Sequence, residues 1–67
     1  MSTCPIKEHE LETVRLMADG KTADEIAKIA GLTKWAIQRR IGRMLVETGA
    51  VNSTNLVAIS LRNKWVQ

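Results

Sequence analysis

The chain of 67 residues has the length of one small domain, and its composition, 45% hydrophobic and 25% charged, is that of a globular protein. Its single cysteine excludes an internal disulfide, and no apolar run is as long as a membrane-spanning helix. The net charge of +3 is modest, but residues 26–46 contain five basic residues and no acidic one. We therefore expect a cytoplasmic protein whose positive field is concentrated in the middle of the chain.

Apolar residues at helical spacing predict one helix over residues 7–19 and a second over residues 21–30, after a flexible arm at residues 1–5. Gly20 is expected to end the first helix. Thr22 is the predicted N-cap of the second helix, because Glu25 follows three residues later as in a capping box. The residues expected to face the core from these two helices are Leu11, Val14, Leu16, Met17, Ala18, Ala23, Ile26, Ala27 and Ala30.

A tight turn is predicted at Gly31, since glycine adopts a positive φ at little cost, and Leu32 is expected to cover that turn. Thr33 is the predicted N-cap of a third helix that extends to about residue 47. Two helices joined by a glycine-containing turn have the layout of a helix-turn-helix, whose second helix enters the major groove of DNA. The core-facing residues of this third helix are predicted to be Ile37, Ile41, Met44, Leu45 and Thr48.

The opposite face of the third helix combines basic side chains, an amide and an indole without any acidic residue. Arginine and glutamine present the donors and acceptors that match guanine and adenine in the major groove. Gly42 lowers helix stability by about 1 kcal/mol relative to alanine, and close contact with DNA would explain its missing side chain. We interpret this face as a DNA-reading surface; the alternative is a solvated charged face with one weak helix former. Its residues are Trp35, Gln38, Arg39, Gly42 and Arg43.

Gly49 is expected to end the third helix, and Ser53 to cap a last helix that extends to about residue 63. Leu56, Val57 and Ser60 form one stripe of this helix. A domain this small has a marginal core, so a second apolar side suggests a homodimer interface. The alternative is a deeply embedded terminal helix. The residues of the predicted interface are Ala58, Ile59, Leu61, Arg62 and Trp65.

No set of residues predicts catalysis, a metal site, a cofactor or a small-molecule ligand. His9 has no cysteine, aspartate or second histidine at ligand spacing, and Cys4 has no partner thiol. The serines have no neighbouring base that would activate a nucleophile. We expect a protein that is not an enzyme and that binds neither a membrane nor a cofactor.

Four segments in register carry a family resemblance. KEHELE at residues 7–12 is similar to T-x-R-E-x-E, RLMADGKTADEIA at residues 15–27 to L-x-x-G-x-S-x-K-E-I-A, GLT at residues 31–33 to G-I-S, and TGAVNSTNLVA at residues 48–58 to L-G-V-x-N-R-T-x-A-V. In this register residues 6–66 resemble the LuxR/GerE-type helix-turn-helix domain. The resemblance implies an all-α four-helix domain, unrelated to winged helices, whose third helix reads the major groove and whose fourth helix pairs two protomers.

The resemblance also implies roles by position. Base contacts are implied at Gln38, Arg39 and Gly42. Thr22 lies where the start of the second helix meets a phosphate, and Thr33 opens the third helix. Contacts to the DNA backbone or to flanking positions are implied at Lys34, Trp35, Arg40 and Arg43. The family usually has T-V-K-x-H at residues 36–40; glutamine in place of its lysine favours adenine readout, with Arg39 supplying the lost charge.

The function that this implies is a dimeric, sequence-specific transcription regulator on a pseudo-palindromic operator in double-stranded DNA. The chain starts about five residues before the predicted fold, so we expect a stand-alone regulator unless it is a fragment of a larger one. Without a sensor or receiver domain, occupancy would follow protein concentration, which favours an autoregulatory repressor of a bacterium, a phage or another mobile element. Two alternatives are an interaction module that heterodimerises with and inhibits a larger LuxR-type regulator, and a promoter-recognition domain like region four of a sigma factor.

Overall fold

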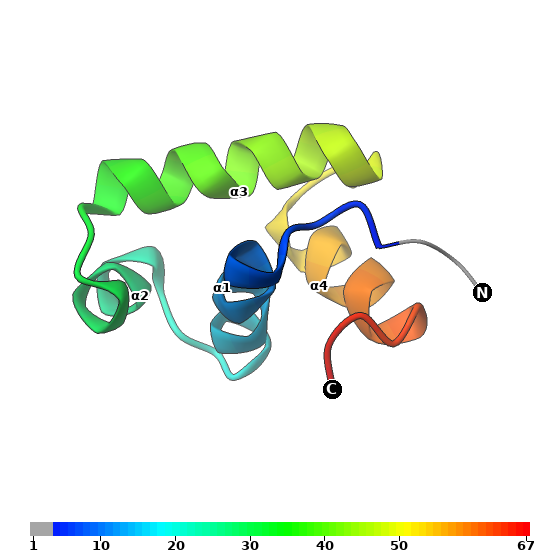
Figure 1. Ribbon diagram of the computed structural model, residues 1–67, viewed down its shortest axis with the longest axis horizontal. Helices are drawn as coiled ribbons and strands as arrows, with labels where there is room; N and C mark the ends of the chain where they lie inside the picture. The colour runs from blue at the N-terminus through cyan, green and yellow to red at the C-terminus, as the bar shows by residue number, and fades with distance from the viewer. Residues whose placement is uncertain (1–3) are drawn as a thin grey trace.

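The computed structural model describes residues 4–67, and the regular elements within this range are all α-helices. They are α1 (Glu8–Ala18), α2 (Ala23–Ala30), α3 (Lys34–Thr48) and α4 (Ser53–Arg62). α3 runs along one side of the molecule and contacts each of the other three helices (Figure 1). The prediction of four helices and no strand is confirmed for this range, whereas residues 1–3 of the predicted arm lie outside it.

α2 begins with the predicted capping box and ends at the predicted glycine. The Thr22 hydroxyl accepts a hydrogen bond from the Glu25 N–H at 3.2 Å, and the Glu25 carboxylate accepts one from the Thr22 N–H at 2.9 Å. Gly31 has φ 69°, in the left-handed region, and its N–H bonds back to the Lys28 carbonyl. Both ends of α2 are therefore determined by contacts within a few residues.

A first buried cluster joins α2 to α3 through Ile26, Ala27 and Ile37. One prediction for this region is wrong: Ala30 shares the face of Ile26 and Ala27, but it is the last residue of α2 and is exposed. Leu32, which was predicted to cover the turn, is 40% exposed.

A second buried cluster joins α1, α3 and α4. It contains predicted helix positions and two residues from outside the helices, Ile6 and Val66, which the helical periodicity did not identify. Cys4 is half-buried against this cluster, and its thiol lies 3.5 Å from the Ile6 carbonyl. Ala18, a predicted core residue of α1, is exposed in the last turn of its helix. The six residues of the cluster are Ile6, Leu11, Val14, Met44, Leu56 and Val66.

The start of α4 differs from the prediction by one residue, since Asn52 is the N-cap and Ser53 is the first helical residue. The Asn52 side chain accepts a hydrogen bond from the Asn55 N–H at 2.8 Å, and the Asn55 side chain accepts one from the Val51 N–H at 3.0 Å. This reciprocal pair satisfies one donor inside the helix and one before it. Asparagine and serine are both good N-caps, so the residue types alone do not decide between them.

No helix in residues 4–67 has the length and apolar character needed to cross a membrane.

Candidate nucleic-acid interface

α3 has one buried face and one exposed face, as its periodicity predicts. Ile37 and Met44 are fully buried against the rest of the domain. On the other side Trp35 is 64% exposed and Val46 is 83% exposed, and Arg39 and Gly42 between them are exposed as well. These last four residues are spaced as one helical stripe, and Gln38 lies exposed beside it. We call Trp35, Gln38, Arg39, Gly42 and Val46 the outer face of α3.

Val46 was absent from the sequence-predicted site although its spacing places it there. It follows Gly42 by four residues and Arg39 by seven, so it continues the same stripe. A large apolar side chain that is this exposed near the end of a helix contributes little to the core. The spacing alone was a sufficient signal for including it.

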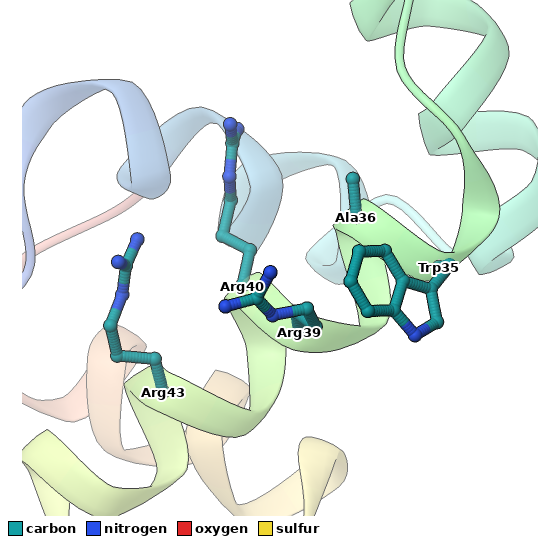
Figure 2. A pocket seen from close by; sticks show the side chains of 5 residues that line it. All are labelled: Trp35, Ala36, Arg39, Arg40 and Arg43. Carbon is teal, nitrogen blue, oxygen red and sulfur yellow. The ribbon is translucent and has the colours of Figure 1, made fainter.

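The Arg39 side chain is stacked on the Trp35 indole. The guanidinium carbon of Arg39 lies 4.8 Å from the centroid of the ring, one helical turn back along α3 (Figure 2). Attraction between a guanidinium cation and the negative face of an indole stabilises such a pair, weakly when it is exposed. The N–H donors of the Arg39 guanidinium group make no hydrogen bond or ion pair within residues 4–67.

Arg43 is bound to α1 through a buried acid. Its Nε donates a hydrogen bond to Glu10 Oε2 at 3.2 Å, and one of its terminal nitrogens donates to the same oxygen. The Glu10 side chain is fully buried, and its other carboxylate oxygen, Oε1, has no hydrogen-bond partner within residues 4–67. The Arg43 side chain remains about half exposed, so its outward N–H groups still reach the surface.

The charges of this pair stabilise each other. Burial by itself raises the pKa of Glu10, but the hydrogen bond and positive charge of Arg43 bring the pKa below its ordinary value. The same carboxylate raises the pKa of Arg43. Both groups are therefore ionised at neutral pH, and moving Arg43 away would leave a buried charge without its partner, which is strongly unfavourable.

The remaining basic side chains of α3 also meet partners from other helices. Arg40 Nη1 lies 3.5 Å from the hydroxyl of Thr13, which is buried in α1. Lys34 Nζ lies 3.5 Å from a carboxylate oxygen of Asp24 at the start of α2. Residues 26–46 contain no acidic residue, as the sequence shows, but the folded domain brings Asp24 of α2 next to Lys34 and the buried Glu10 of α1 next to Arg43.

Glu10 and Thr13 were not predicted as part of the site. Glu10 precedes Val14 by four residues and Met17 by seven, so it occupies an inward-facing position of α1. An acidic residue at such a position requires a buried partner, and this was the signal that could have identified it. Which basic residue would meet it depends on the packing of α1 against α3.

A groove of about 270 Å³ lies beside α3 and is bordered by three guanidinium groups and one indole (Figure 2). Arg40 and Arg43 extend from α3 toward α1, while Arg39 lies over the indole. Cationic donors around a shallow, open groove suit an anionic group such as a phosphate. The groove is lined by Trp35, Ala36, Arg39, Arg40 and Arg43.

The two predicted threonines are exposed at helix starts and both act as caps. The Thr33 hydroxyl accepts a hydrogen bond from the Ala36 N–H at 3.0 Å. At Thr22 the backbone N–H is already bonded to the Glu25 carboxylate, and this bond lowers the pKa of Glu25. The Thr22 amide is thus occupied by an internal anion, which competes with a phosphate at the start of α2.

On α4 the predicted dimer residues divide into two groups. Leu61 is 45% exposed and Arg62 is exposed, with Ala58 and Ile59 half-buried beside them. Trp65 instead packs partly against the second buried cluster, and its indole N–H is buried without a hydrogen-bond partner within the described chain. Of the five predicted dimer residues, Leu61 and Arg62 are the exposed ones.

No protein-family model, curated protein or solved structure matches this chain. Among residues 4–67, no group of three or more His, Cys, Asp or Glu side chains is placed to hold a metal ion. The outer face of α3 and the arginine-lined groove beside it form the candidate site.

Proposed function

We propose that the chain is a sequence-specific DNA-binding transcription regulator of the LuxR/GerE helix-turn-helix type. In this proposal α2 and α3 are the two helices of the motif, and α3 enters the major groove. The observation that carries the proposal is the outer face of α3, where Gln38 and Arg39 are exposed with base-reading groups while Ile37 and Met44 on the opposite side of the same helix are fully buried. A helix held rigidly by one face can present the other at a defined position.

Gly42 supports this interpretation. A Cβ atom added at Gly42 would meet no other atom of the domain within 4 Å, so internal packing does not require glycine there. Glycine in a helix interior is nevertheless unfavourable. Close approach of α3 to the floor of a DNA groove would explain the glycine at position 42, because without a side chain there the helix backbone can come closer to the bases. Val46, one turn further on, is suited to contact with a thymine methyl group.

The charges support distinct roles for the arginines. Arg43 and Arg40 are held toward α1 and border the groove, where their free N–H groups suit a backbone phosphate. Arg39 is left on the outer face for base readout. In protein–DNA recognition, phosphate contacts usually position the protein and base contacts read the sequence. Here Arg40 and Arg43 would make the phosphate contacts and Arg39 the base contact.

The regulator is proposed to act as a small dimeric repressor that pairs through α4. Two copies would place their α3 helices in successive major grooves, about one helical turn apart, on a pseudo-palindromic operator. If occupancy of the operator depends only on protein concentration, this suits a repressor that regulates its own promoter. Exposed Leu61 and the glutamine at position 38 also suit the second candidate, an interaction module that inhibits a larger LuxR-type regulator.

The test is binding to the DNA directly upstream of the coding sequence, measured by fluorescence anisotropy against scrambled DNA at low and moderate salt. We expect preference for the upstream DNA and an affinity that falls steeply with salt, because counterions are released from contacted phosphates. Arg39→Ala should reduce specific binding by about 1–3 kcal/mol. Lys64→Ala, which removes an exposed positive charge beyond α4, is the matched control and should keep the preference. Absence of binding to either DNA at low salt contradicts the proposal and favours the interaction module.

A further inference from the structure

Arg39 differs from the other basic residues of α3 in how its side chain is held. It makes no hydrogen bond or ion pair within residues 4–67, and its contact is the stack on Trp35. The other three reach polar side chains of α1 or α2 at distances of 3.5 Å or less. These three are Lys34, Arg40 and Arg43. Arg39 is therefore the basic side chain of α3 whose hydrogen-bond donors are all uncommitted in this range.

The geometry of the stack is compatible with base readout. Guanine is recognised through two parallel N–H donors from the edge of a guanidinium group to its O6 and N7 atoms. The Arg39 guanidinium carbon lies over the indole, and no hydrogen bond or ion pair within residues 4–67 uses its N–H donors, so they are available for such a contact. The stack also restricts the rotamers of Arg39 before DNA binds, which reduces the entropy lost when the contact forms.

The surroundings of Trp35 and Arg39 are exposed. Helical side chains lean toward the N-terminus, so Arg39 lies over Trp35 and away from Gly42. The space at the Gly42 Cβ position is empty, and Trp35 itself is largely exposed. Arg39 is itself exposed, and its guanidinium group makes no hydrogen bond or ion pair within residues 4–67.

We propose that Trp35 is a positioning residue for Arg39, and that the pair reads one guanine in each half-site of the operator. The inference rests on the proposed DNA-binding function and adds to it the base that is recognised and the residue that orients the contact. It assigns Trp35 a role in specificity, and it leaves the phosphate contacts to Arg40 and Arg43.

The experiment is selection from a pool of double-stranded DNA with a randomised stretch of about 20 base pairs, enough for two half-sites one helical turn apart. Wild-type protein and four variants are taken through the same selection and sequencing. The variants are Trp35→Ala, Trp35→Phe, Arg39→Ala and, as the control, Lys64→Ala. The preference for each base is then measured by anisotropy on the selected DNA and on DNA with the guanine changed to adenine.

For the wild type we expect one guanine position per half-site, preferred by about five- to a hundredfold over adenine. Arg39→Ala should remove this preference and leave other selected positions in place. Trp35→Ala should lower the same preference by about two- to tenfold, because Arg39 is then ordered only on binding. Trp35→Phe, which keeps an aromatic face, should retain most of it, and Lys64→Ala should match the wild type.

Several outcomes overturn the inference while leaving the proposed function standing. One is a wild-type motif whose Arg39-dependent position is not guanine. Another is a Trp35→Ala variant that keeps the guanine preference within twofold of wild type or loses affinity equally at every position, which would make Trp35 a backbone contact. If the wild-type protein enriches no sequence at all, the proposed function itself fails. Circular dichroism checks that each variant is folded, as the exposure of both side chains predicts.

Discussion

Gly42 is the glycine of this chain that lies inside a helix. The other three have positive φ and follow helix ends, whereas Gly42 lies in the middle of α3 with open space around its Cβ position. Gly42→Ala should therefore raise the free energy of unfolding by about 1 kcal/mol, because alanine loses less backbone entropy in a helix. Urea unfolding followed by circular dichroism measures this. If α3 is pressed against DNA there, the same change should weaken operator binding.

Gly49→Ala is the matched control for this prediction. Gly49 ends α3 with φ 74°, which is strained for any residue with a Cβ atom, so the control should lower the free energy of unfolding. A Gly42→Ala protein that is less stable than wild type would show that α3 has a packing requirement at this position.

Glu10 makes folding stability dependent on pH. Its pKa in the folded protein lies below the ordinary value of 4.5, so ionised Glu10 stabilises the fold above that value. This contribution is lost as the pH falls through the folded-state pKa. Glu10→Gln keeps the shape and removes the charge, so its free energy of unfolding should fall less steeply than that of wild type between about pH 5 and pH 3.

Urea unfolding at several pH values measures both slopes. Part of the slope remains in Glu10→Gln, because the pKa of Glu25 is also lowered, through its bond to the Thr22 N–H. Identical slopes for Glu10→Gln and wild type would mean that the Glu10–Arg43 pair does not form in solution.

At the scale of the elements, the N-cap of α4 is Asn52 in the structure, whereas the sequence predicted Ser53. Asn52→Ala removes the side-chain acceptor for the Asn55 N–H and should lower the free energy of unfolding by about 1 kcal/mol. Ser53→Ala, one residue later, removes a side chain that caps nothing and should have little effect. Denaturant unfolding of the two variants compares them directly. If Ser53→Ala lowered the free energy of unfolding more than Asn52→Ala, Ser53 would be the N-cap instead.

The two faces of α3 show how far an element can be predicted alone. The prediction that Ile37 and Met44 face the core and Trp35 faces outward is confirmed, because a period of 3.6 residues is a property of the helix itself. The same period could not separate Arg39, which stays on the outer face, from Arg43, which is bound by α1. That difference comes from another helix.

At the scale of the whole molecule, the proposal is that two copies of the chain pair through α4. Leu61→Glu places a charge on the exposed apolar side chain of the predicted interface and should shift a dimer toward monomer, because burying an unpaired charge is unfavourable. Sedimentation at matched concentrations measures the shift. Leu61 is a cleaner site than half-buried Ile59, since a charge at Ile59 would also disturb the domain.

Val51→Glu is the control, since Val51 is an exposed apolar residue outside α4. It should leave the oligomeric state unchanged. A Leu61→Glu protein that sediments like wild type would exclude this part of α4 from the interface.

By itself, the sequence determined the four helices, the capping box at Thr22, the left-handed turn at Gly31, the end of the third helix at Gly49, and the main inward stripes. These features depend on hydrogen bonds and side-chain spacings within a few residues. Only the tertiary structure decided that Glu10 meets Arg43, that Asp24 meets Lys34, and that Ile6 and Val66 complete the core. Such contacts join residues far apart in the chain, and they depend on how the helices pack against one another, which local periodicity does not specify.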